Sequence, residues 1–143
     1  MIDDTDKEIL EVLGDNARTP FLNIAKQLGV SESTIRKRVN NLEENGVIKK
    51  YSVIIEPTKL GYGSVAIVGI DVVPEKFLDV SKKLTKFDNV KFVATTTGDH
   101  MIMIEIWMDK TSELRDFISD KIEKMDGVTR TCPAIINEKL KEK

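Results

Sequence analysis

Hydroxyl, amide and cationic side chains recur at helical spacing between residues 31 and 45. At about 100° per residue, Ile35, Val39 and Leu42 share one side of a helix. The polar groups occupy the opposite side and its flanks: Ser33, Thr34, Arg36, Lys37, Arg38, Asn40 and Asn41. Asparagine can pair with adenine, lysine or arginine with guanine, and flanking cations with phosphates. The pattern therefore predicts a helix that contacts DNA.

Two further helices are expected to position this one. The first follows an acidic cap at Asp3 or Asp4, and the second follows Thr19-Pro20, read as a cap with proline at the first helical position. Gly29 ends the second helix and Ser31 caps the third. A short helix, a glycine-containing turn and a second helix have the proportions of a helix-turn-helix.

Positive charge is concentrated in this region, although the chain has a formal net charge of -2. Residues 18–41 carry five cations against the single acid Glu32, whereas residues 3–15 are strongly acidic. Such a distribution favours docking in one orientation over general polyanion binding. Arg18 and Lys26 are expected to add backbone contacts from the side of the second helix.

Length and composition bound the remaining possibilities. The chain has 143 residues, 41% of them hydrophobic and 32% charged, which is enough for two small soluble domains. Its apolar runs fall far short of the roughly 20 residues of a spanning helix, and its acidic start is unlike a signal peptide. The single cysteine, Cys132, agrees with a reducing compartment. We therefore expect a cytoplasmic protein with no membrane association.

The hydrophobic pattern changes from helical to alternating near residue 47. We assign residues 1–50 to the helix-turn-helix (winged-helix-like) domain, 51–63 to a β-strand linker and 64–143 to a second domain, with a strand or ribbon expected over residues 48–56. The second domain reads as βαββαβ, a ferredoxin-like sandwich, so the fold class is α+β. Its elements are expected at residues 64–73, 74–87, 90–97, 101–108, 112–125 and 128–137.

Both faces of the predicted sheet carry apolar residues. Residues 101–107 place Ile102, Ile104 and Ile106 on one face and Met101, Met103, Glu105 and Trp107 on the other. Two helices can cover only one of these faces. A closed single core is the alternative, but the pattern favours a dimer or larger assembly joined through the sheets.

Several motifs resemble the Lrp/AsnC family, the leucine-responsive or feast/famine transcription regulators, with archaeal members nearest. They are DDTDKEIL at residues 3–10, NAR at 16–18, IA through G at 24–29, Ser31, Arg38-Val39, Leu42-Glu43 and GVI at 46–48. The βαββαβ order of the second half is similar to that of the family's ligand-binding and oligomerisation domain. The resemblance implies a regulator that binds double-stranded DNA, assembles from homodimers into octamers and binds an amino-acid effector between ligand domains.

The resemblance also indicates where an effector would bind. The family places it near a Gly-Asp-aromatic-Asp turn; Gly98 and Asp99 match, but His100 and Met101 replace the aromatic residue and the second acid. Asp99 could accept from a ligand ammonium group, and the Thr96 or Thr97 hydroxyls could donate to its carboxylate. Pro74 and Glu75 form a second expected wall. Alternatively, Asp99 and His100 only complete a surface turn.

Other functional classes have less support. A Cys132/His100 nucleophile and base pair is formally possible, but no phosphate loop or second base accompanies it, so no enzyme, cofactor or metal site is expected. The remaining alternative is a stand-alone amino-acid-binding sensor or scaffold that does not bind DNA. It would lack the cationic outward face of the third helix, which is present in this sequence.

Overall fold

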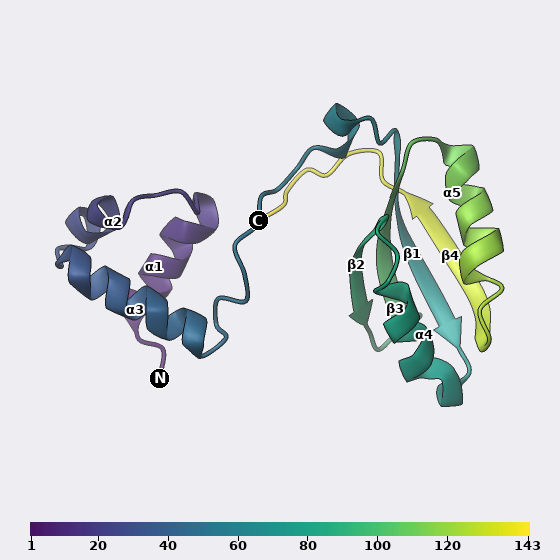
Figure 1. Cartoon of the computed structure of the whole chain (residues 1–143), viewed down its shortest axis with the longest axis horizontal. Helices are drawn as coiled ribbons and strands as arrows, with labels where there is room; N and C mark the ends of the chain where they lie inside the picture. The colour runs from purple at the N-terminus through teal and green to yellow at the C-terminus, as the bar shows by residue number, and fades with distance from the viewer. The chain divides into compact units, whose positions relative to one another are not determined.

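The computed structural model describes all 143 residues, which form two compact units, residues 1–54 with 141–143 and residues 55–140. The first unit contains three helices, α1 (Asp4–Asp15), α2 (Phe21–Leu28) and α3 (Glu32–Glu44) (Figure 1). Their inward aliphatic side chains form its core: Ile9, Leu13, Ile24, Ala25, Ile35, Val39 and Leu42. Ala25 is almost fully buried, as expected for the small residue where α2 meets α3.

The ends of these helices follow the expected signals with one exception. Asp3 caps α1 through a reciprocal capping box with Asp6, and Ser31 accepts from the Thr34 amide at the start of α3. Gly29 ends α2 with φ of 69°, a conformation that favours glycine. The expected Thr19 cap is wrong: its hydroxyl donates to the Asn16 carbonyl, and α2 begins at Phe21 without a side-chain cap.

The second unit has the expected βαββαβ order. Its strands are β1 (Ser64–Val72), β2 (Val90–Thr95), β3 (Ile102–Met108) and β4 (Val128–Ile135), arranged antiparallel in the order β2-β3-β1-β4. A 3-10 turn η2 (Pro74–Lys76) leads into α4 (Phe77–Leu84), and α5 (Thr111–Phe117) continues into the π-helical turn η3 (Ile118–Ile122). Both helices lie against the same face of the sheet (Figure 1).

The expected strand over residues 48–56 is not formed. Apart from the 3-10 turn η1 (Pro57–Leu60), residues 49–63 form no helix or strand, and no wing follows α3. A strand needs a neighbour for its backbone hydrogen bonds, and no other segment of the chain pairs with these residues. The alternating pattern survives as exposed apolar side chains, with Val53 and Ile54 the most exposed.

The two faces of the sheet differ as the alternation predicts. Ile102, Ile104 and Ile106 are fully buried beneath the helices. The opposite face, here called the open face, carries Val65, Ile67, Phe92, Met103 and Trp107. The expected position of Met101 on this face is wrong. Met101 precedes β3 and packs against the helix-covered core rather than lying beside Met103.

Candidate nucleic-acid interface and effector region

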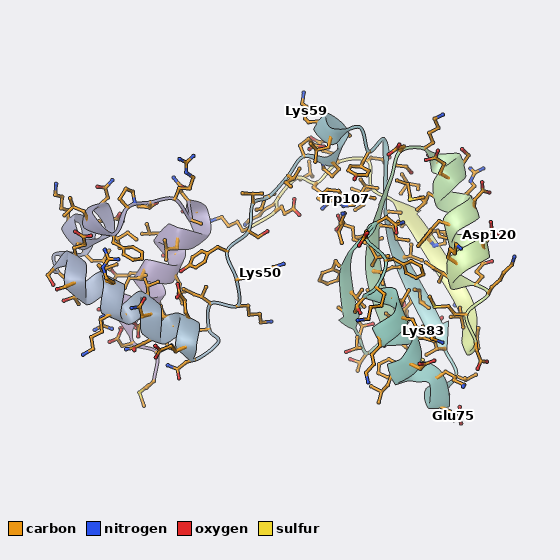
Figure 2. The ribbon with its side chains drawn as sticks, viewed as in Figure 1. Lys50, Lys59, Glu75, Lys83, Trp107 and Asp120 are labelled. Atoms are coloured by element: carbon orange, nitrogen blue, oxygen red, sulfur yellow. The ribbon has the colours of Figure 1, made fainter.

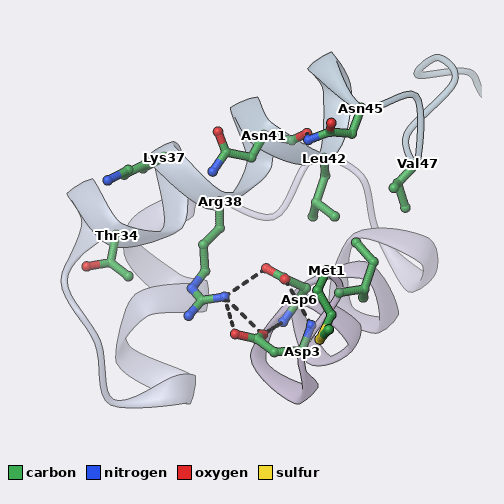
Figure 3. Close-up of a pocket in the computed structure, with 11 residues that line it drawn as sticks. Met1, Asp3, Asp6, Thr34, Lys37, Arg38, Asn41, Leu42, Asn45 and Val47 are labelled. Carbon is green, nitrogen blue, oxygen red and sulfur yellow. Dashed lines mark hydrogen bonds and ion pairs between the residues drawn. The ribbon is translucent and has the colours of Figure 1, made fainter.

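Four exposed polar side chains of α3 have no partner in the chain: Lys37, Asn40, Asn41 and Glu44. Lys37 and Asn41 lie one turn apart, are exposed, and their side chains make no hydrogen bond or ion pair. Both line a hollow of about 730 Å³ that also includes Thr34, Arg38 and Asn45 (Figure 3). A free ammonium and a free amide at this spacing are the groups that base edges and phosphates require.

The other polar residues of α3 are already partnered to different degrees. The Ser33 and Thr34 hydroxyls lie 3.0 and 2.7 Å from the Ser31 hydroxyl, which ties them to the helix cap. Arg36 donates to Glu32 at 3.0 Å, and its guanidinium lies over the Phe21 ring at 5.2 Å. These side chains form part of the same surface but have to exchange an existing contact to reach DNA.

Arg38 points away from the outward side and into the protein. Its Nη1 donates to both oxygens of Asp3, at 2.9 and 2.8 Å, and to Oδ1 of Asp6 at 2.9 Å. The hydrogen bonds that Arg38 donates to the Asp3 and then the Asp6 carboxylate raise the pKa of Arg38. The Asp6 amide and then the Arg38 guanidinium lower the pKa of Asp3. The structure therefore separates Arg38 from Lys37 and Asn41, with which the sequence pattern had grouped it.

The lowered pKa of Asp3 predicts how acid affects this unit. A carboxylate with a depressed folded pKa stabilises the fold above its ordinary value of 3.8, and that stability is lost as pH falls through the folded pKa. We expect Asp3→Asn to lose less stability than the wild type between about pH 5 and about pH 3. Urea unfolding followed by the helical circular dichroism signal measures this, and equal losses in the two proteins would contradict it.

Arg18 and Lys26 are both exposed and have no side-chain partner. Lys26 lies in the last turn of α2, and Arg18 in the turn between α1 and α2. Neither lines the hollow beside α3. They are free to contact a phosphate backbone, but the structure does not gather them with Lys37 and Asn41.

In the second unit, the turn between β2 and β3 holds most of the expected effector residues. Gly98 has φ of 127°, Asp99 is exposed, and neither the Asp99 nor the Thr97 side chain has a partner. The Thr96 hydroxyl donates to the His100 carbonyl at 2.6 Å, and the Thr96 amide donates to the Met101 carbonyl. Thr96 therefore closes the turn rather than offering its hydroxyl to a ligand.

His100 is held by two residues that the sequence pattern did not single out. Its Nδ1 lies 3.3 Å from Oδ2 of Asp71, and both side chains are about four-fifths buried. Its ring lies so close to Gly69 that an added Cβ would sit 2.3 Å from Cδ2. Gly69 and Asp71 alternate along β1 with the core residues Val68, Ile70 and Val72, so this polar site lies on the open face.

Pro74 and Glu75 begin η2, which is separated from β1 by Val73 alone, and lie three and four residues after Asp71. Figure 2 shows Glu75 at one end of this unit and Trp107 toward the other. The Trp107 end is already occupied by side chains: Tyr62 lies against its ring, and Glu105 accepts from Trp107 and Lys139 at 2.7 Å each.

Comparison with known proteins identifies both units. A family model for winged helix-turn-helix DNA-binding matches residues 2–49, and the model for the Lrp/AsnC ligand binding domain matches residues 65–143. The chain belongs to the Lrp/AsnC family of transcription regulators. It is 55% identical to the HTH-type transcriptional regulator LrpA of Pyrococcus horikoshii over 141 residues, covering 99% of this chain and 100% of the relative.

Other relatives agree with this assignment. The chain is 38% identical to the regulator LrpA1 of Halobacterium salinarum, covering 96% of each. Among solved structures, E. coli AsnC superposes with a TM-score of 0.87 at 30% identity, covering 100% of this chain and 97% of that one. The relatives are transcriptional regulators, so this Lrp/AsnC protein is a non-enzymatic DNA-binding regulator with a ligand-binding domain. None of its helices has the length and apolar content needed to cross a membrane.

Proposed function

We propose that this Lrp/AsnC regulator is cytoplasmic and reads the major groove of its operator DNA with α3. The observation that carries the proposal is the unpartnered pair Lys37 and Asn41 on the outward side of a helix that follows the Gly29 turn. Ser33 and Thr34 lie toward the start of the same helix. Of the two flanking cations, Arg36 would contact a phosphate more readily, because Arg38 is bonded to Asp3 and Asp6. Arg18 and Lys26 supply additional phosphate contacts.

The second part of the proposal is an amino-acid effector bound beside the turn between β2 and β3. Asp99 would accept hydrogen bonds from the ligand ammonium group, and the turn amides and Thr97 would donate to its carboxylate. His100 would hydrogen-bond a polar ligand side chain. Gly98, Pro74 and Glu75 would line the site. Thr96 and Met101 act through the turn rather than as direct contacts. A structural neighbour from Neisseria meningitidis is described as a complex with L-Met, which agrees with this class of ligand.

The third part is assembly through the open face into homodimers and then octamers. A dimer would present two copies of α3 to half-sites about one helical turn apart. An effector bound near the subunit junction can change DNA affinity only by binding one assembly geometry better than another. The exposed apolar residues of the open face support this arrangement.

The experiment that tests the proposal is a titration with DNA from upstream of the protein's own gene, with and without a pool of amino acids. Binding that resists competitor DNA and shifts with the pool is the expected result. An affinity that the amino acids leave unchanged would refute the effector part of the proposal. Binding no stronger than to competitor DNA would remove the operator assignment and favour a sensor that does not bind DNA.

A glycine substitution tests the effector region separately. In Gly69→Ala the new methyl group would lie 2.3 Å from the His100 ring, so the ring must leave Asp71. Overpacking of this kind costs about 1–3 kcal/mol of stability. We expect the affinity for the active amino acid to fall about tenfold, which is about 1.4 kcal/mol of binding free energy. A thermal-shift titration with that amino acid measures the change.

The matched control is Gly14→Ala, because a Cβ added there meets nothing within 4 Å. It should keep the full response to the amino acid. If Gly69→Ala keeps that response as well, His100 and Asp71 are not part of the effector site.

A further inference from the structure

Arg38 makes more hydrogen bonds and ion pairs than any other cation of α3, and its partners lie at the start of α1. One guanidinium nitrogen contacts two carboxylates, those of Asp3 and Asp6, which cap and begin α1 (Figure 3). The Asp6 side chain is 11% exposed and that of Arg38 is 30% exposed. The cluster is thus partly withdrawn from solvent and carries one more negative charge than positive.

The position of this cluster matters for DNA binding. Arg38 follows Lys37 directly and lies about one turn from Thr34 and Asn41, and all four line the same hollow. In Figure 3 Lys37 and Asn41 extend away from the two carboxylates, whereas Arg38 extends toward them. A cation that lines the DNA-contacting surface is therefore already neutralised within the protein.

Neutralisation of this kind has a calculable effect on binding. Non-specific affinity comes from cations that replace the counterions of phosphates. Each phosphate neutralised adds about 0.9 to the salt slope, which is the steepness with which the logarithm of the affinity falls with the logarithm of the salt concentration. A guanidinium that already holds two carboxylates replaces no counterion, and the excess negative charge repels phosphates. Sequence-dependent contacts from Lys37 and Asn41 then make up a larger share of the total.

We propose that Asp3 and Asp6 are specificity-determining residues that withhold Arg38 from the DNA backbone. The inference rests on the proposed major-groove role of α3 and goes beyond it by assigning a function to acidic residues of α1. It also revises the expectation that Arg38 itself contacts phosphates. The simpler alternative is a salt bridge that only holds α1 against α3, and the salt dependence of binding distinguishes the two.

The test uses the full-length protein and isosteric, charge-removing substitutions. Asparagine is as good an N-cap as aspartate, so Asp3→Asn with Asp6→Asn keeps the caps while freeing Arg38. The matched variant adds Arg38→Gln to these two, which leaves no unpaired charge. Lys37→Gln reports whether α3 contacts DNA at all. The probes are a scrambled duplex of about 30 base pairs and the upstream DNA, measured by anisotropy between about 50 and 200 mM salt.

The double variant should bind the scrambled duplex with a salt slope steeper by about 0.9 per subunit and lose specificity for the upstream DNA. The triple variant should return to the wild-type slope, and Lys37→Gln should lower the slope by about 0.9 per subunit. A triple variant with a slope as low as that of Lys37→Gln would show that Arg38 contacts phosphate in the wild type, and would overturn the inference.

An unchanged slope in a folded double variant would overturn it equally. If the double variant does not fold, the comparison of the triple variant with the wild type still decides, because it needs no free Arg38. If Lys37→Gln changes neither the salt slope nor the preference for the upstream DNA, the major-groove role of α3 is refuted, and the inference with it.

Discussion

Ile67→Asp is expected to dissociate the protein into folded monomers of 16.1 kDa. Ile67 lies near the middle of β1 on the open face, opposite Glu105 and Ala134 in the neighbouring strands, and is 39% exposed. Phe92 on the same face is 54% exposed. A single chain gains little by leaving these side chains in water, whereas a partner that covers them gains apolar burial.

An aspartate at position 67 would be solvated in the monomer but buried in the assembly. Burying an unpaired carboxylate costs several kcal/mol, so we expect subunit affinity to fall by about a hundredfold or more. Light scattering after gel filtration measures the mass. Operator affinity should fall as well, because two copies of α3 no longer act together.

The control for this variant is Leu78→Asp. Leu78 is an aliphatic residue of α4 that is 70% exposed, on the helix-covered side of the sheet. The same change in side chain and charge should leave the assembly intact there. If the Ile67→Asp protein keeps the mass of the wild-type assembly in solution, the open face is not the subunit interface.

Local signals in the sequence were sufficient for most of the fold. Caps at Asp3 and Ser31 and the turn at Gly29 depend on residues within four positions of each other, so they could be predicted directly. Strand alternation likewise identified the buried face of β3. The strand expected over residues 48–56 failed because a strand also depends on a neighbour, which alternation within one segment does not reveal.

The contacts that define the candidate sites were not predictable in this way. Arg38 meets Asp3 from 35 positions away, and His100 meets Asp71 from 29 positions away. Both contacts depend on how helices pack or strands pair, and an outward cation looks the same in sequence whether or not a carboxylate reaches it. The structure therefore changed the assignment of Arg38 and added Gly69 and Asp71.

Lys37→Glu is expected to abolish specific operator binding without unfolding the protein. Lys37 is exposed and has no partner in the chain, so reversing its charge breaks no internal contact. On DNA, each subunit would lose a contact worth about 1–3 kcal/mol and gain a repulsive charge, so a dimer loses about 2–6 kcal/mol. Each 1.4 kcal/mol is about tenfold in affinity, and the loss would be measured by anisotropy on the upstream DNA.

Lys82→Glu is the matched control, because Lys82 is an exposed lysine of α4 that belongs to neither candidate site and whose side chain makes no hydrogen bond or ion pair. It makes the same change in net charge in the ligand-binding domain. If long-range charge alone governed binding, both variants would weaken it to a similar extent at low salt, and raising the salt would erase the difference from the wild type. A loss confined to Lys37→Glu that persists at high salt would require direct contact between α3 and the bases, whereas full binding by Lys37→Glu would refute that contact.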